Sequence, residues 1–280
     1  MTIPAQLPDP DAHAARIERE SQFWDERQSA ADSRDPALYR VTATDRTDRS
    51  VPWLQHLGFD RYIACMLDHI QMRPGMRLLD LGTGTGFLAT LLAANGAEVD
   101  SLDVSESSLE VARWRARISG VADRIRFHLM PAEALAFPDA VFDAACGNFV
   151  LHHLNLPVAA AELRRVLKPG AGGAFLETCD YNILLRTARR WLPGHFGIEK
   201  ASSDDEAPLG IEAQATLRGV FGESVRFAYP DTVMFRMLSY VPSLHRRPAR
   251  MALAACDRLL HAVPRLRSLS YHGVVCLRRD

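Results

Sequence analysis

The chain has 280 residues, of which 48% are hydrophobic and 24% are charged, and its formal net charge is −1. This composition excludes collagen, a long coiled coil and wholesale disorder, and the balanced charge argues against a polyanionic partner such as nucleic acid. The 5 cysteines are scattered without a CxxC pair, which predicts reduced thiols in a cytoplasmic protein and no zinc site.

The first 70 residues are predicted to form a helical extension. Residues 11–28 and 52–70 carry apolar side chains at helical spacing, and the polar stretch 29–50 between them is typical of a loop. The polar start of the sequence lacks the apolar core of a signal peptide, and no segment is apolar enough over about 18 residues to predict a membrane span. A proline–glycine pair at 74–75 marks the start of the next region.

Between residues 76 and 177 the patterns of strands and helices alternate. Strands are predicted at 77–81, 98–103, 125–129, 141–147 and 173–177, and helices at 87–95, 106–119 and 158–167. A further helix is predicted at 211–221, with further strands at 224–228 and 271–277. Because the connections are short, this order predicts an α/β fold with a mostly parallel sheet and helices on both faces.

The most informative segment is 78–86, which reads LLDLGTGTG. A predicted strand runs there into a glycine-rich turn and then a helix. Glycines let the backbone bend sharply and let a ligand approach closely, and in open α/β sheets ligands bind at the carboxyl ends of strands. A dinucleotide site would need a third glycine at the position of Phe87, and the Gly-Lys-Ser/Thr sequence of a P-loop does not follow.

The spacing of Gly82, Gly84 and Gly86 after Asp80 resembles the first motif of the class I S-adenosylmethionine-dependent methyltransferases. Asp103 strengthens the resemblance, because an acid at the end of the second strand can accept hydrogen bonds from both ribose hydroxyls. Further segments follow in the family's order at 131–138, 142–153 and 165–170.

The resemblance implies a Rossmann-like class I methyltransferase fold with a mostly parallel seven-stranded sheet. Residues 71–280 would form the methyltransferase domain around the core 76–177, and residues 1–70 an N-terminal helical extension or lid. The stretches at about 179–210 and 231–270 would be helical insertions.

The cofactor implied by the resemblance is S-adenosyl-L-methionine, with S-adenosyl-L-homocysteine as product. The residues assigned to cofactor binding are Asp80, Gly82, Thr83, Gly84, Gly86, Asp103, Val104, Ala132, Glu133, Asn148 and Phe149. Asp103 would bind ribose, the Ala132 amide would face adenine, and Asn148 would line the methionine end. The family often has an acid where this chain has Pro131, so either Glu133 substitutes or that contact with adenine is missing.

Methyl transfer needs mainly positioning, and a base is required only if the acceptor loses a proton. His152 and His153 follow the fourth strand, near the expected place of the methyl group, and imidazole suits proton transfer near neutral pH. Alternatively, one member of the pair caps or packs. Glu177 at the end of the fifth strand and Tyr181 beyond it are further catalytic candidates, and the absence of a carboxylate cluster predicts no catalytic metal.

The insertions are the only guide to the acceptor. The stretch 231–270 combines apolar side chains with seven arginines against two aspartates, which would suit a lid over a hydrophobic, anionic small molecule. Helices that merely cover the sheet would show the same pattern. We expect a secondary metabolite or a lipid or glycan intermediate rather than nucleic acid, because the sequence after the fourth strand is not Asn/Asp-Pro-Pro-aromatic.

Methylation of a protein side chain and a non-catalytic, cofactor-binding partner subunit remain open as alternatives, and so does a homodimer.

Overall fold

The computed structural model describes residues 10–29, 34–51, 54, 57–191, 208–241, 244 and 246–280. Part of the predicted helix at 52–70 and half of the first predicted insertion, residues 192–207, lie outside these residues. The elements follow in the order α1 (Pro10–Ser29), α2 (Pro36–Tyr39), α3 (Phe59–His69), β1 (Arg77–Leu81), α4 (Phe87–Ala94), β2 (Glu98–Asp103), α5 (Glu106–Ile118), β3 (Ile125–Leu129), β4 (Phe142–Asn148), α6 (Leu156–Val166), β5 (Leu167–Thr178), α7 (Ile183–Trp191), α8 (Ile211–Phe221), β6 (Arg226–Ala228), α9 (Arg247–Ala262) and β7 (His272–Arg278).

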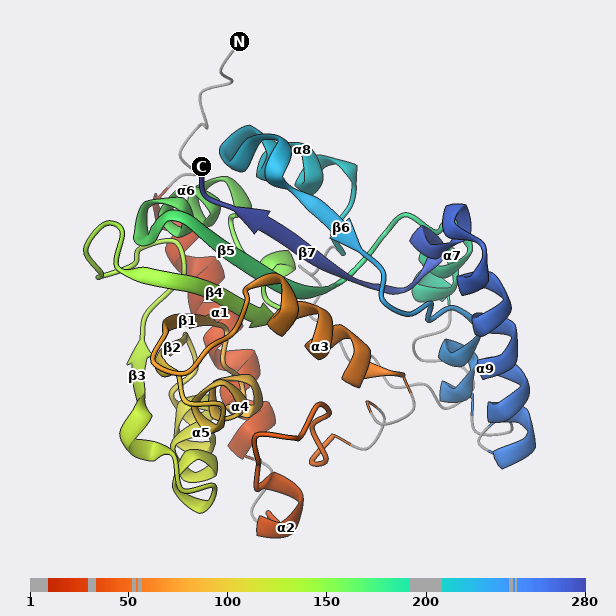
Figure 1. Ribbon diagram of the computed structural model, residues 1–280, viewed down its shortest axis with the longest axis horizontal. Coiled ribbons are helices and arrows are strands. Elements are labelled where there is room, and N and C mark those ends of the chain that lie inside the picture. The colour runs from red at the N-terminus through yellow and green to blue at the C-terminus, as the bar shows by residue number, and fades with distance from the viewer. Residues whose placement is uncertain are drawn as a thin grey trace.

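The strands form one seven-stranded sheet in the order β3-β2-β1-β4-β5-β7-β6 (Figure 1). Strands β1 to β5 pair in parallel, and β7 runs antiparallel to both β5 and β6. The sheet confirms the predicted fold class. Since the parallel strands all end at one edge, the turns that follow β1, β2 and β4 meet there.

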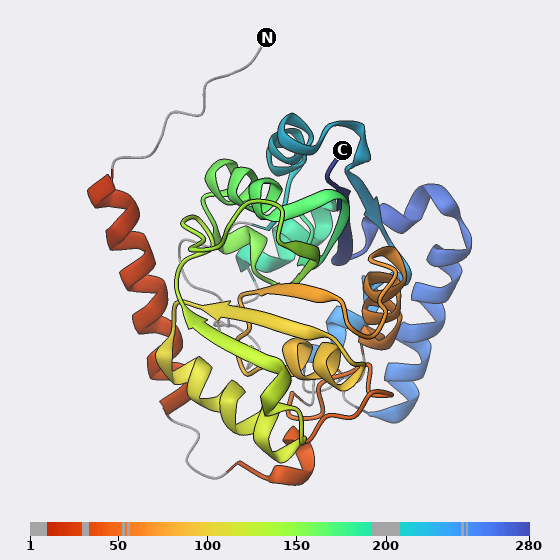
Figure 2. The same ribbon diagram turned by 60° about the vertical axis from the view of Figure 1, so that its left-hand side comes forward.

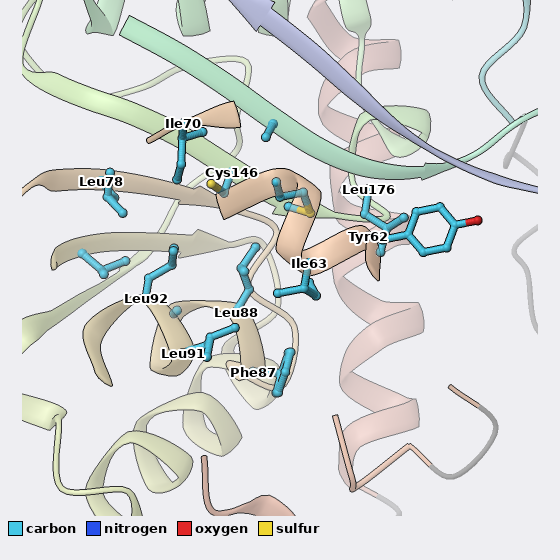
Figure 3. Close-up of a cluster of buried hydrophobic side chains, with 14 of the residues drawn as sticks. Tyr62, Ile63, Ile70, Leu78, Phe87, Leu88, Leu91, Leu92, Cys146 and Leu176 are labelled. Atoms are coloured by element: carbon cyan, nitrogen blue, oxygen red, sulfur yellow. The ribbon is translucent and has the colours of Figure 1, made fainter. Parts of the chain in front are cut away.

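Helices cover both faces of the sheet, and a separate hydrophobic cluster lies under each layer (Figures 1 and 2). On one face α3 and α4 contribute Tyr62, Ile63 and Leu91, which pack with Leu78 of β1 (Figure 3). The other face packs beneath α6 and α8 and includes Leu79 of β1. Consecutive residues of β1 therefore serve opposite layers, and each fully buried leucine contributes roughly 1.5–3 kcal/mol to folding.

Two element boundaries differ from the prediction by more than two residues. Helix α3 begins at Phe59 rather than near residue 52, because Gly58 adopts a left-handed conformation (φ 73°) just before it. Strand β5 begins at Leu167 rather than at 173. Leu167 pairs with Phe142 before a shift in register, so the stretch around Gly170, which precedes the predicted strand, is an irregularity within the observed one. The predicted loop 29–50 also contains the short helix α2.

The segment between β6 and β7 is joined to α3 by a buried polar network. Asp231 accepts hydrogen bonds from the Arg236 guanidinium, 2.7 Å away, and lies 3.3 Å from Arg61 of α3. The Tyr62 hydroxyl donates to the backbone oxygen of Asp231 at 2.9 Å. Breaking a buried pair of this kind leaves a charge unsatisfied, so the network holds this insertion against the core. Among the helices described, none has the length and apolar character needed to cross a membrane.

Candidate active site

A cavity of about 150 Å³ opens where β1 and β4 end. Its walls come from the glycine turn, the start of α4, the turn after β4, helix α3 and a segment of the N-terminal extension. The lining residues are Arg46, Thr47, Asp48, Leu54, Phe59, Ile63, Asp80, Gly82, Thr83, Gly84, Thr85, Phe87, Leu88, Asn148 and Phe149. Six of the predicted cofactor-binding residues are thus brought together: Asp80, Gly82, Thr83, Gly84, Asn148 and Phe149.

The three glycines of the turn all have positive φ, between 49° and 79°, but they meet different surroundings. A Cβ at Gly82 would lie 2.6 Å from Val150, and one at Gly86 would lie 2.6 Å from Ala112. At Gly84 a Cβ would meet nothing within 4 Å. The first and third glycines therefore allow close packing, whereas the second faces open space at the cavity, where a ligand can approach the backbone.

Asp103 holds the glycine turn from the neighbouring strand. Its Oδ2 accepts the Gly84 amide at 2.8 Å and its Oδ1 accepts the Ser105 amide at 3.0 Å. Burial raises the pKa of the carboxyl group above its ordinary value. Each carboxylate oxygen can accept more than one hydrogen bond, so Asp103 retains capacity for hydroxyl donors while it fixes the turn.

Three buried oxygens at the cavity lack hydrogen-bond partners within the described chain, namely Oδ1 of Asp80, Oγ1 of Thr83 and Oδ1 of Asn148. The other oxygen of Asp80 accepts from Ser101 at 2.9 Å, and burial raises the pKa of Asp80 to about 7. An unsatisfied buried acceptor costs about 1–3 kcal/mol, so these oxygens suit a ligand that carries donors, above all a cationic one.

The turn after β4 is held in an uncommon conformation. Phe149 has φ 56°, which is unusual for a residue with a side chain. Its amide donates to the Leu176 carbonyl at 2.7 Å, and its ring lies 5.7 Å from Phe59 and 5.4 Å from His272. These contacts stabilise the uncommon backbone conformation of the turn and hold both Asn148 and Phe149 at the cavity wall.

Glu177 secures the residues that follow this turn. Its fully buried carboxylate accepts the amides of Val150 and Leu151 through Oε1, at 3.0 and 2.7 Å. Oε2 lies 2.6 Å from Nδ1 of His152. The His152 ring in turn packs against His153, with 4.2 Å between ring centroids. Three of the predicted catalytic residues thus lie together, although none lines the cavity itself.

Helix α1 runs along the same edge of the sheet and lies beside α5 (red, Figure 2). At one end Asp25 accepts the Ser105 hydroxyl at 2.6 Å. At the other, Arg16 pairs with Glu133 and donates to the carbonyl of His153. The helix therefore bridges the turn after β2 and the turn after β4. Glu133, the alternative considered for the adenine contact, uses Oε1 to bind Arg16 and is not among the residues that line the cavity.

Other predicted site residues also lie outside the cavity lining, Asp103 among them. Gly86 caps α4, and Val104 and Ala132 lie beyond the ends of β2 and β3. Tyr181 contacts other residues than the histidine pair does. Its ring packs on Phe227 at 5.8 Å, and its hydroxyl lies 3.5 Å from the Gly210 carbonyl. Burial raises the pKa of Tyr181 above its ordinary value.

Arg46, Thr47 and Asp48 form a wall of the cavity that was not predicted from the sequence. This wall is fixed by Arg115, a fully buried residue of α5, whose guanidinium contacts both carboxylate oxygens of Asp48 at 2.9 and 3.1 Å. Arg115 also donates to Thr85 of the glycine turn at 3.3 Å. The stretch is polar and lacks periodicity, so its sequence carries no signal for this pairing. The one available signal was Arg115 itself, an arginine within an amphipathic helix.

Residues 79–175 match the family model described as "Methyltransferase domain". The ubiquinone/menaquinone biosynthesis C-methyltransferase UbiE of Shewanella pealeana is 38% identical over 109 residues, which cover 38% of this chain and 43% of that protein. The UbiE protein of Paracoccus denitrificans is 40% identical over 115 residues, covering 40% and 46% respectively. The chain thus matches less than half the length of these curated relatives.

The similarity in structure extends over nearly the whole chain. The [4+2]-cyclase SpnF matches with a TM-score of 0.57 and 19% identity, covering 94% of this chain and 96% of that one. The geranyl diphosphate C-methyltransferase of Streptomyces coelicolor A3(2) matches with a TM-score of 0.56 and 15% identity, covering 98% and 99%. At this identity the similarity shows the fold alone. It extends to the segments before residue 79 and after residue 175, which the family model does not match.

Proposed function

We propose that the chain, whose residues 79–175 belong to the class I S-adenosylmethionine-dependent methyltransferases, transfers a methyl group from S-adenosylmethionine to a hydrophobic small molecule. One observation carries the proposal. The glycine-turn cavity presents three buried oxygens without partners in the described chain, on Asp80, Thr83 and Asn148, and the ammonium group of the cofactor's methionine portion would donate to those of Asp80 and Asn148.

The other groups of the cofactor also find matching residues. Asp103 would accept the ribose hydroxyls with the lone pairs that Gly84 and Ser105 leave free. Arg46 would bind the methionine carboxylate. It lines the same cavity, and its Nη1 donates to the carbonyls of Ala43 and Asp45, which leaves other guanidinium donors available.

When bound, S-adenosylmethionine supplies an electrophilic methyl group on a cationic sulfur. The chain's part is to align the acceptor and exclude water, and positioning of this kind can supply about 7–11 kcal/mol of a barrier. Glu177 orients His152 through Nδ1, so that Nε2 of His152 is the ring atom that would take a proton from the acceptor. Glu177 is on this account a positioning residue.

An apolar acceptor is supported by the aromatic rings beside the cavity. Phe59 and Phe149 line it, and His272 packs against both at 5.3 and 5.4 Å. The two UbiE relatives are named for C-methylation in ubiquinone and menaquinone biosynthesis, and a relative from Symbiobacterium thermophilum is named a demethylmenaquinone methyltransferase. We therefore propose demethylmenaquinone-like and prenyl compounds as the first acceptors to assay.

Calorimetric titration with S-adenosylhomocysteine tests the proposed cofactor site. We expect saturable binding that Asp103→Ala weakens at least tenfold, because the variant loses both a ribose contact and the anchor of the glycine turn. No binding, or binding of NAD in its place, would refute the proposal.

A further inference from the structure

Helix α9 is held to the rest of the fold by hydrogen bonds of Asp257, which lies on one side of the helix. Asp257 is fully buried and accepts the amides of Met234, Phe235 and Arg236 at 3.1, 2.7 and 3.1 Å. It also accepts the Arg236 guanidinium at 2.9 Å. The face that bears Asp257 therefore points inward, and α9 presents its opposite face to the outside of the molecule, at the periphery in both views (blue, Figures 1 and 2).

This opposite face is apolar. At 100° per residue it comprises Met251, Ala252, Cys256 and Leu259, which we call the outer face of α9, and all four are exposed. Val263, the extended residue that follows the helix, is exposed as well. The exposed fractions of Met251, Leu259 and Val263 are 62%, 73% and 46%. A helix on the surface of a globular protein normally turns charged and polar side chains to solvent, so the outer face lacks the usual chemistry of a free surface.

The charges around the outer face have one sign. Residues 241–270 contain six arginines, no lysine, and Asp257 as the sole acid, which is buried. Four of the arginines are exposed, namely Arg246, Arg247, Arg258 and Arg265. Within the described part of the chain, none of these four forms an ion pair. The apolar strip is therefore flanked by exposed cations that no described carboxylate neutralises.

We propose that the outer face of α9 docks the protein peripherally on an anionic membrane surface. An apolar strip flanked by arginines is the pattern of a helix that lies in the interface plane, and anionic headgroups would supply the missing negative charges. A second copy of the chain fits less well. A two-fold contact through the outer face would bring like-charged segments together without an acid between them. The proposal stands on α9 and does not depend on methyl transfer.

Co-sedimentation with vesicles tests the proposal on the full chain. We expect binding to vesicles of phosphatidylcholine mixed with phosphatidylglycerol, weak binding to phosphatidylcholine alone, and loss of binding in high salt. Leu259→Asp should weaken vesicle binding at least tenfold, and the double variant Arg247→Glu, Arg258→Glu should do the same. Ile211→Asp, which changes an equally exposed side chain (75%) on α8, is the matched control and should bind as the unmodified chain does.

Thermal unfolding checks that each variant keeps its fold, as substitutions of exposed residues should. Equal affinity for both kinds of vesicle, or equal loss in the α8 control, would overturn the proposal. Analytical ultracentrifugation without lipid tests the alternative that a second copy of the chain binds the outer face of α9. A dimer that Leu259→Asp dissociates would identify the outer face as a contact between copies and would also overturn it.

Discussion

Nδ1 of His152 lies 2.6 Å from Oε2 of Glu177, and the other oxygen of the same carboxylate accepts two backbone amides of the turn after β4. One side chain on β5 therefore sets both the path of this turn and the orientation of the imidazole. The ring is held by a single nitrogen, so Nε2 is the atom that remains to act on an acceptor.

His152→Ala is expected to lower the single-turnover rate of methyl transfer at least a hundredfold, because the proposed proton acceptor is lost. Affinity for S-adenosylhomocysteine should change less than about threefold, since His152 does not line the cavity. Rapid-quench kinetics and calorimetry measure the two effects separately. An unchanged single-turnover rate would remove His152 from the mechanism.

Glu177→Gln should reduce the same rate by about tenfold or more, since it keeps the size of the side chain but alters the hydrogen bond to His152. Glu212→Gln, at an exposed position on α8, is the matched control. If both variants lost activity equally, or if Glu177→Gln lost only cofactor affinity, the positioning role would be wrong.

Cofactor affinity is expected to depend on pH through Asp80. Burial raises the pKa of this carboxyl to about 7, so it is largely protonated at lower pH, while the ammonium of the ligand favours its ionised form. Affinity for S-adenosylhomocysteine should therefore rise roughly tenfold from about pH 6 to about pH 8, with release of a proton on binding. Calorimetry in buffers of different ionisation enthalpy measures both. In Asp80→Asn the rise should vanish, whereas Asp123→Asn, at an exposed position, should retain it.

The same shift has a consequence for stability without ligand. Since the folded-state pKa of Asp80 lies above its unfolded value, the folded state holds more protons between about pH 4 and pH 7, and this group's contribution to stability declines as pH rises through that window. Asp80→Asn should thus raise the melting temperature at pH 8 more than at pH 5. An equal effect at both values would contradict the shift.

Arg46→Ala should weaken binding of S-adenosylhomocysteine by roughly tenfold to a hundredfold, because a charged hydrogen bond to the ligand's carboxylate is lost. Binding of 5′-methylthioadenosine, which lacks the amino acid portion, should be unaffected. Arg117→Ala, at an exposed position on α5, serves as the control. Equal losses for the two ligands would show that Arg46 supports the fold of the cavity rather than the carboxylate.

Asp48→Ala should destabilise the fold by about 3–5 kcal/mol, since it leaves the buried guanidinium of Arg115 without its carboxylate. Glu98→Ala removes one partner of an exposed pair with Arg124 and should cost less than about 1 kcal/mol. Urea unfolding measures both changes. A small effect of Asp48→Ala would mean that Arg115 does not anchor the N-terminal segment.

The strands and the glycine turn could be predicted because their signals are local. Apolar runs such as 78–81 report burial, and the spacing of Gly82, Gly84 and Gly86 reports a turn that close packing requires. The resemblance to a family rests on the same segment. It predicted that Asp80 and Asn148 belong to one site, and both line the same cavity.

The rest of the site depends on pairings between distant residues. Asp48 reaches the cavity through Arg115, which is 67 positions away, and Arg16 meets Glu133 across 117 positions. Neither polar pair leaves a periodic trace in the sequence, because periodicity records burial and not the identity of a partner. For the same reason the sequence indicated Glu177 only as a catalytic candidate and carried no sign that its carboxylate accepts the amides of the turn after β4.

The most direct test of the central claim is mass spectrometry after incubation with methyl-deuterated S-adenosylmethionine and a panel of quinone and prenyl acceptors. The account predicts a product that carries the intact labelled methyl group, formed together with S-adenosylhomocysteine and greatly reduced in Asp103→Ala. Tight binding of the cofactor without labelled product from the panel or from a lipid extract would contradict the claim of methyl transfer.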